Sequence, residues 1–386
     1  MKNASTIIPC YAADTSGVCS ALYELGGMTV VHDASGCNST YSTHDEPRWY
    51  DIDSMIYISA LTEIDAIMGN DERIISDTVA AAADLHPHFI ALCGSPMPMM
   101  TGVDFDAIAE EIQQRTGIRT FGLHTNGTRS YIEGASEAFL AIVKEYVHDC
   151  PKTEGIGVNI LGATPLDIPW NTTMAGIKKW LADCGFEYVS CLGMESSLEE
   201  IKKAASAKVN LVVSYAGMAA AEYMLTEFGI NFVTGLPVGE GFSEQLGENI
   251  REAAAAYEYG CVSAEGMGFD DSTGKCTAVI IGESIASKSL AGALRLDAGI
   301  DAKVICPLPA DEVILSDGDM ALYAEEDIKA ALEEIKPELV IADPLYRYVI
   351  PKESRQIELP HFAFSGRCFG SRMPDLTKID IKEFLK

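Results

Sequence analysis

The feature that most constrains this chain is a regular alternation of short β-branched runs with amphipathic segments, almost from end to end. Several runs, such as GVNILG and ELVIAD, are nearly continuous in apolar residues, which is typical of parallel strands buried on both faces. The segments between them, such as SEAFLAIVKEYV and TMAGIKKWLADCG, have helical spacing. We therefore predict an α/β chain of parallel sheets covered by helices. The predicted strands are 28–33, 54–60, 88–95, 118–123, 157–162, 187–193, 209–215, 231–237, 276–283, 302–309, 338–343 and 361–366.

The chain is too long, at 386 residues, for one hydrophobic core, and twelve predicted strands exceed one doubly wound sheet. The polar, turn-rich stretch PKTEG at 151–155 precedes a new predicted strand and marks one boundary. A second boundary falls in FDDSTGK at 269–275. We predict three Rossmann-like domains with parallel sheets, at 1–150, 151–270 and 271–386.

The net charge of −29 comes from 28 Lys and Arg against 57 Asp and Glu, and it disfavours binding to nucleic acid or to an anionic membrane surface. It suits a soluble protein, or one that docks with a basic patch on a partner. No apolar run reaches the roughly 18 residues that span a bilayer. The N-terminal MKNASTIIPC lacks the apolar core of a secretion signal. We therefore predict a cytoplasmic protein that contacts neither membrane nor nucleic acid.

A nucleotide site is not indicated. The stretch GIGVNILG at 155–162 resembles a dinucleotide fingerprint only superficially, because its glycines are wrongly spaced and its second half has the pattern of a strand. The chain contains no GxxxxGK[ST] loop, so we expect that it does not bind ATP itself.

The eleven cysteines are odd in number and include no CxxC pair, which argues against a disulfide framework and against a zinc ribbon. Most lie in apolar runs, as Cys191 and Cys306 do, and are predicted core residues. Three cysteines of the first predicted domain differ: Cys10, Cys37 and Cys93. Cys37 ends VVHDASGC and Cys93 ends HFIALC, so both follow predicted parallel strands at the edge where such sheets bind ligands.

These three cysteines are separated by 27 and 56 residues, which is too long for a compact ferredoxin loop but allows convergence at one sheet edge. Three soft thiolates in a cytoplasmic protein suit an iron–sulfur cluster better than calcium or magnesium. On the residues alone, two alternatives stay open: cluster ligands, or three ordinary core thiols.

The stretches around these cysteines resemble the nitrogenase component 1 family. MTVVHDASGCNSTY is similar to the family segment that ends His-Gly-x-x-Gly-Cys, and TEIDAIMGNDERI to its Glu-x-Asp-x-x-x-Gly-Gly motif. CGSPMPMMTGVDFDAI resembles its Cys-Pro-x-x-Leu-Ile-Gly-Asp-Asp stretch. Further pieces, including GLHTNGTRSYIEGASEAFLAIV, KVNLVVSY, FGINFVTGLPVG, GKCTAVIIGE and HFAFSGRCFG, follow in the family's order, so the resemblance covers nearly the whole chain.

By this resemblance, Cys10, Cys37 and Cys93 match three cysteines that each subunit gives to an interface cluster, either a 4Fe–4S cluster or an 8Fe P-cluster. His32 would donate to a cluster sulfur or a loop carbonyl, or would simply bond the turn; Gly36 would let the backbone approach. Three ligands leave a 4Fe–4S cluster one short. The resemblance therefore implies a homodimer, or a heterodimer or tetramer with a component-1-like subunit, and electrons from an ATP-dependent iron protein.

The sequence departs from nitrogenase itself at two positions. The family's catalytic molybdenum–iron cofactor is held by a Cys and a His, where this chain has Ser214 and Phe369. A hydroxyl is a poor soft-metal ligand and a phenyl ring is none, so dinitrogen reduction is not expected. The resemblance implies an oxidoreductase subunit acting on an organic or tetrapyrrole-like substrate, with catalytic residues unassigned. The alternatives are a metallocluster-assembly scaffold of the same fold and a non-redox small-molecule-binding α/β protein.

Overall fold

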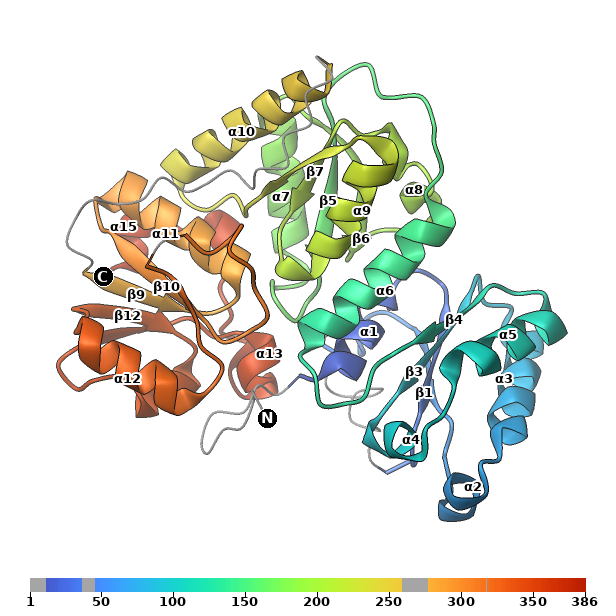
Figure 1. Ribbon diagram of the computed structural model, residues 1–386. Helices are drawn as coiled ribbons and strands as arrows, with labels where there is room; N and C mark the ends of the chain where they lie inside the picture. The colour runs from blue at the N-terminus through green and yellow to red at the C-terminus, as the bar shows by residue number, and fades with distance from the viewer. Residues whose placement is uncertain (1–11, 37–45, 259–276, 317) are drawn as a thin grey trace.

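The computed structural model describes residues 12–386 except for 37–45, 259–276 and 317 (Figure 1). The described strands form three sheets, with orders β2-β1-β3-β4, β6-β5-β7-β8 and β11-β10-β9-β12-β13. All strand pairs within these sheets are parallel. The predicted α/β class with three parallel sheets is therefore confirmed.

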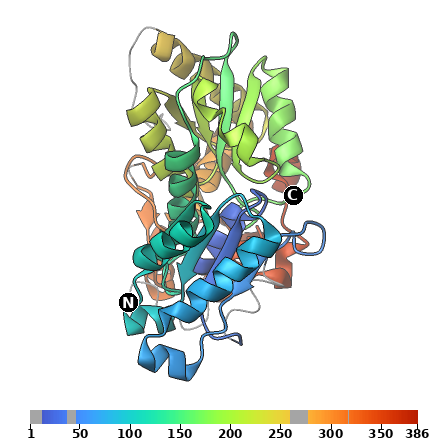
Figure 2. The ribbon, with the colours of Figure 1, turned by 90° about the vertical axis from the view of Figure 1, so that its right-hand side faces the viewer.

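The first sheet carries apolar side chains on both faces, and helices cover both. Helices α3 and α5 cover one face, as the side view shows (Figure 2), and α1 and α6 cover the other. The strands are β1 (Met28–His32), β2 (Met55–Ile58), β3 (Ile90–Gly94) and β4 (Thr120–Leu123). The helices are α1 (Asp14–Leu22), α2 (Glu63–Met68), α3 (Asp71–Leu85), α4 (Pro96–Thr101), α5 (Phe105–Thr116) and α6 (Tyr131–Tyr146).

The second sheet packs α7 and α10 on one face and α8 and α9 on the other. Its strands are β5 (Gly157–Ala163), β6 (Glu187–Gly193), β7 (Val209–Val212) and β8 (Asn231–Thr234). Its helices are α7 (Thr173–Asp183), α8 (Leu198–Ile201), α9 (Met218–Phe228) and α10 (Glu240–Glu258), with 3-10 turns η1 (Ala204–Ser206) and η2 (Tyr215–Gly217).

The third sheet lies between α11 and α12, and α11 also packs against α10 of the second. Its strands are β9 (Ala278–Ile281), β10 (Ala302–Cys306), β11 (Met320–Ala321), β12 (Leu339–Ala342) and β13 (Arg355–Glu358). Its helices are α11 (Ser284–Ala298), α12 (Glu325–Ile335), α13 (Phe362–Ser365), α14 (Arg367–Gly370) and α15 (Ile381–Phe384), with turns η3 (Pro344–Tyr348) and η4 (Leu376–Lys378). No helix within the described ranges is long and apolar enough to cross a membrane.

The strand predicted at 361–366 is wrong: this segment begins the short helix α13. Its residues Phe362–Ser365 are all buried, and a short apolar run that is buried on every side has no period to separate strand from helix. Two strands were missed. They are β11, of two residues, and β13, which carries the polar sequence RQIE at a sheet edge.

Each sheet lies within one of the segments 1–150, 151–270 and 271–386, but the apolar core does not divide in the same way. Helix α6 packs along α9, and one cluster of buried side chains includes Phe139 of α6, Met224 of α9 and Phe364 of α13. The three predicted domains therefore agree with the three sheets, but they do not have three separate apolar cores. The division into domains remains a prediction.

Helices α1 and α6 cross in backbone contact, and two glycines permit it. A Cβ atom on Gly17 would lie 2.0 Å from the carbonyl oxygen of Tyr131, and one on Gly134 would lie 1.9 Å from that of Asp14. Real Cβ atoms do not approach this closely, so any larger residue must push the helices apart.

We expect Gly134→Ala to lower the free energy of unfolding by about 2 kcal/mol, through overpacking at this crossing. Alanine by itself favours a helix over glycine by about 1 kcal/mol, so a loss isolates the contact between the helices. Gly155→Ala is the control, because its Cβ would meet only Glu187 Oε2, at 3.8 Å. Urea denaturation measures both; equal stability of the two variants would contradict the crossing.

Candidate functional site

His32 closes β1 and pairs in register with Gly94, the last residue of β3, so both strands end at the same edge. Its Nδ1 atom lies 2.7 Å from Ser59 Oγ, and its ring meets Phe105 edge-on. Burial lowers the pKa of His32 and nearby carboxylates oppose this only in part. The imidazole is thus neutral at pH 7 and held against the residue that follows β2. A role toward a cluster stays a prediction.

Cys93 is the penultimate residue of β3, and its side chain is fully buried. The thiol lies 3.8 Å from the carbonyl oxygen of Val30 and contacts Cys19 of α1. The hydrogen bond with Cys19 and the burial both raise the pKa of Cys93. Its position at the carboxyl end of a strand is the one predicted for a cluster ligand, and metal binding to a thiol displaces its proton. The role of Cys93 stays a prediction.

Cys10 and Cys37 lie outside the described residues. Gly36, the last described residue before Cys37, is exposed, and a Cβ atom there would meet nothing within 4 Å. Within the described part of the chain, no three His, Cys, Asp or Glu side chains are placed to hold a metal ion. Because two of the three predicted ligands lie outside the described residues, the structure does not test the predicted ligand set, which stays a prediction.

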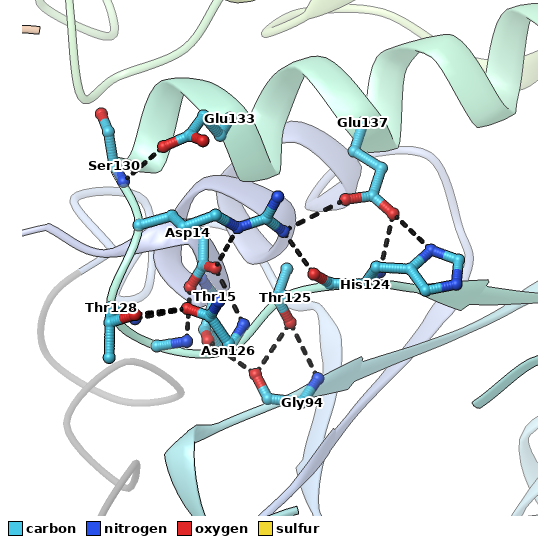
Figure 3. A network of polar contacts seen from close by, with 12 residues as sticks. Asp14, Thr15, Gly94, His124, Thr125, Asn126, Thr128, Ser130, Glu133 and Glu137 are labelled. Carbon is cyan, nitrogen blue, oxygen red and sulfur yellow. Dashed lines mark hydrogen bonds and ion pairs between the residues drawn. The ribbon is translucent and has the colours of Figure 1, made fainter. Parts of the chain in front are cut away.

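A buried carboxylate organises the loop beside this edge (Figure 3). Asp14, the first residue of α1, is 0% exposed. Its Oδ1 accepts hydrogen bonds from the backbone N–H groups of Thr15 (2.8 Å) and Gly127 (2.7 Å), and its Oδ2 from that of Asn126 (2.8 Å) and from Nε of Arg129 (3.3 Å). Burial raises the pKa of Asp14, and the hydrogen bonds from these donors lower it only in part. One side chain thus ties α1 to the loop that follows β4.

The same loop holds the end of β3. Thr125 Oγ1 donates to the carbonyl oxygen of Gly94 and accepts from its N–H, each at 2.8 Å (Figure 3). Thr15 Oγ1 also donates to that carbonyl, at 3.2 Å. The backbone immediately after Cys93 is therefore fixed from two sides.

A second polar site lies where the carboxyl ends of the second and third sheets meet. A cavity there is lined by apolar side chains, with Asp167, Thr173, Glu283, Ser287 and His361 as its polar residues. No Lys or Arg among the described residues lines it. Its volume is about 30 Å³, which admits about one water molecule and is well below the roughly 300 Å³ or more of a typical ligand pocket.

Asp167 collects contacts from all three parts of the chain. Its Oδ1 accepts a hydrogen bond from the hydroxyl of Tyr131, at the start of α6, and its Oδ2 from Ser214 Oγ at 2.6 Å. Nε2 of His361, from the third part, lies 3.3 Å from Oδ1. The carboxyl group is only 4% exposed, so these contacts replace the water it has lost.

Glu283 directly precedes α11 and caps its first turn. Its Oε2 accepts a hydrogen bond from the N–H of Ala286 at 2.8 Å, and its Oε1 accepts from the N–H of Tyr215 at 3.0 Å. The side chain is 1% exposed. Burial, and then the charge of Asp167, raise the pKa of Glu283 to about 7.

Asp343 supports the cavity from behind. Its carboxylate accepts hydrogen bonds from the N–H of His361 at 2.8 Å and from Ser365 Oγ at 2.7 Å. The ring of His361 lies against Phe364, with centroids 4.6 Å apart. These contacts fix the imidazole at the wall of the cavity.

The two positions that depart from nitrogenase have other partners here. Ser214 is fully buried, and its hydroxyl is used to hold Asp167. Phe369 lies in α14 with the guanidinium of Arg372 4.8 Å from its ring centre. Cys368 beside it is exposed. Neither position offers a soft metal ligand.

The sequence reasoning missed Asp167, Glu283 and Asp343. Each follows the end of a parallel strand: β5 ends at Ala163, β9 at Ile281 and β12 at Ala342. The indication was present in GATPLD, IIGES and IADPL, where an acidic residue stands within four positions of a strand's end. That edge is where parallel sheets bind ligands.

Three parallel sheets covered by helices, with polar groups at the carboxyl ends of their strands, define a Rossmann-like α/β protein. Residues 17–366 match the model of the family described as nitrogenase component 1 type oxidoreductase. The chain belongs to this family, as its motifs predicted.

Among curated relatives, the chain is similar to one of the subunits of the light-independent protochlorophyllide reductase of Leptolyngbya boryana, with 26% identity over 181 residues, or 44% of this chain and 36% of the relative. The Trichormus variabilis counterpart is 22% identical over 76% of this chain and 63% of the relative. The nitrogenase iron-molybdenum cofactor biosynthesis protein NifE of Clostridium pasteurianum is 26% identical over 45% and 38%. The matches thus span about a third to under two thirds of these relatives.

Among solved structures, nitrogenase Cp1 at pH 5 superposes with a TM-score of 0.64, at 16% identity, over 93% of this chain and 85% of that chain. The same protein at pH 6.5 gives a TM-score of 0.63 at 15% identity, over 93% and 86%. At such identities the likeness is one of fold.

We expect Asp14→Asn to lower the free energy of unfolding by about 2 kcal/mol, because an amide nitrogen would face buried N–H donors. Asp106→Asn, in the same neighbourhood, removes a carboxylate that is 67% exposed and paired with His124, and should cost less than about 0.5 kcal/mol. Chemical denaturation measures both. A stable Asp14→Asn variant would show that the network does not anchor this edge.

Proposed function

We propose that this chain is an iron–sulfur subunit of a nitrogenase-like reductase. It would accept low-potential electrons from an ATP-dependent iron protein and reduce an organic or tetrapyrrole-like substrate. The observation that carries the proposal is the family match over residues 17–366, which includes Cys93 at the carboxyl edge of the first sheet. The likeness to several protochlorophyllide reductase subunits supports the substrate class.

Cys10, Cys37 and Cys93 are the proposed ligands of the cluster, which is 4Fe–4S or a larger 8Fe cluster shared with another chain. When bound, such a cluster supplies electron transfer at low potential. For Cys93 to bind iron, its sulfur must turn from Cys19 and lose its proton. The hydrogen bonds of Thr125 and Thr15 to Gly94 would hold the backbone in place while this happens.

A partner chain is part of the proposal, as a homodimer or as a heterodimer or tetramer with a component-1-like subunit. The short helices α2 and α4, which contact each other, expose large apolar side chains. Ile67 is 78% exposed and Met100 82%. Exposed apolar patches of this kind mark contact surfaces, and this one adjoins the end of β3, because α4 begins two residues after Gly94.

Two other functions each have one observation in their favour. The likeness to the cofactor biosynthesis protein of Clostridium pasteurianum favours a metallocluster-assembly scaffold. The cavity beside Asp167, with polar groups at the carboxyl ends of two sheets, favours a small-molecule-binding protein without redox chemistry.

We expect the anaerobically purified chain to be brown and to contain about three or more iron atoms, since three thiolates per chain suit such a cluster. Cys93→Ala should lose most of this iron. Cys191→Ala is the matched control, because Cys191 is also a fully buried strand cysteine. Iron analysis and the visible absorption spectrum measure the effect.

A colourless chain that takes up no iron on anaerobic reconstitution would contradict the cluster and favour the non-redox alternative. Equal iron in both variants would contradict the role of Cys93 but not the presence of a cluster.

Turnover separates a reductase from a scaffold. We expect the iron-loaded chain, with a component-1-like partner, a nitrogenase-type iron protein and ATP, to reduce a tetrapyrrole such as protochlorophyllide, followed by absorption. Transfer of iron to an apo-protein acceptor without reduction of the tetrapyrrole would instead establish the scaffold.

A further inference from the structure

We propose that Asp167 and Glu283 form a buried proton-donating pair, in which the two carboxyl groups hold one proton between them and Glu283 presents it to the cavity. Both side chains line the same cavity, and they are 4% and 1% exposed. They come from different sheets, at the ends of β5 and β9, and meet only because the fold joins these edges.

The groups that face the pair do not neutralise two negative charges. Asp167 is contacted by the hydroxyls of Tyr131 and Ser214, and Glu283 by backbone N–H groups and by Ser284 Oγ at 3.2 Å. The titratable groups nearby are His361, Asp343 and Cys306, from the segment before α13, the end of β12 and β10.

The nearest lysine of the same helix is already paired. Lys288 of α11 lies with Nζ 2.6 Å from Asp319 Oδ2, in an ion pair whose side chains are only 6% and 4% exposed. Its ammonium group therefore compensates the carboxylate of Asp319.

Two like charges in one buried site interact strongly, so the second carboxyl ionises only at much higher pH than the first. Two hydroxyl groups donate hydrogen bonds to the carboxylate of Asp167, and Nε2 of His361 lies 3.3 Å from its Oδ1. Glu283 is the better acid, since burial and the charge of Asp167 raise its pKa to about 7. A proton held at this pKa is available near neutral pH.

The cavity, at about 30 Å³, admits about one water molecule, so a substrate bound next to it would receive this proton through that water; this use rests on the function proposed above. Each two-electron reduction takes two electrons from the iron–sulfur donor and two protons. Glu283 gives one proton to the substrate by breaking its O–H bond, and its carboxylate takes up another from solvent before the next transfer. The protonation of the pair itself requires neither iron nor substrate.

The test is infrared spectroscopy of the full chain, following the C=O stretch of protonated carboxyl groups from pH 5.5 to 8.5. We expect a band that disappears across neutral pH in the unaltered chain and is absent from Glu283→Gln. Glu46→Gln is the matched control and should keep the band. Glu46 is 5% exposed but lies 2.6 Å from Nε of Arg48, so it is compensated by a cation.

Asp167→Asn tests whether the charge of Asp167 raises the pKa of Glu283, which a purely structural role of Asp167 would not do. Without the neighbouring charge, the remaining band should disappear at a lower pH, because the charge of Asp167 contributes to the raised pKa of Glu283. A band that Glu283→Gln leaves intact, or a midpoint that Asp167→Asn does not shift, would overturn the pair.

The pH dependence of thermal unfolding is a second test, because a raised pKa of Glu283 fixes the direction in which stability changes with pH. Unfolded glutamate is ionised above about pH 4.5, whereas folded Glu283 ionises near pH 7, so its contribution to stability is lost as pH rises through 7. Between pH 5.5 and 8.5 the unaltered chain should therefore lose more stability than Glu283→Gln. A chain that binds no iron but shows the pH-dependent band of Glu283 would contradict only the proposed cluster. A chain that binds iron but lacks this band would contradict only the proposed pair.

Discussion

The close crossing of α1 and α6 is the contact on which both polar sites depend. Gly17 and Gly134 let the two backbones touch, and no other residue type fits there without separating the helices. Helix α1 begins with Asp14, which anchors the loop beside Cys93, and α6 begins with Tyr131, whose hydroxyl reaches Asp167. A change in the crossing would therefore move the edge of the first sheet and the wall of the cavity together.

The fold concentrates acidic groups at the point where the sheets meet. Asp167, Glu283 and Asp343 each follow a parallel strand, and parallel strands direct their carboxyl ends to one edge. Backbone N–H groups and hydroxyls satisfy these carboxyls, and no Lys or Arg of the described chain lines the cavity between them. Hydrogen bonds hold such groups in place but do not cancel their charge, so the site retains a proton that an ion pair would release.

The nearly continuous apolar runs predicted the parallel sheets correctly. A strand that is buried on both faces has no solvent-facing side, so its sequence does not alternate between polar and apolar residues. The same property made 361–366 ambiguous, and the buried α13 was mistaken for a strand. For the candidate site, the chain order placed Cys93 at the end of a strand but said nothing about the direction of its thiol. Asp167 and Glu283 were missed because their meeting depends on how separate sheets pack, which no local pattern records.

Burial contributes to a raised pKa at both Cys93 and Glu283, yet the two groups differ in how well their surroundings stabilise the anion. Around Glu283, the N–H groups of Tyr215 and Ala286 already point at the carboxyl oxygens and stabilise the carboxylate. The thiol of Cys93 faces Cys19 and a carbonyl oxygen, neither of which stabilises a thiolate. The carboxyl group of Glu283 can therefore release its proton without a metal, whereas the thiol of Cys93 needs a metal ion to take the place of its proton. The proposed electron transfer at the first sheet would thus require a bound cluster, whereas the proposed proton transfer at the junction of the sheets would require only the protein.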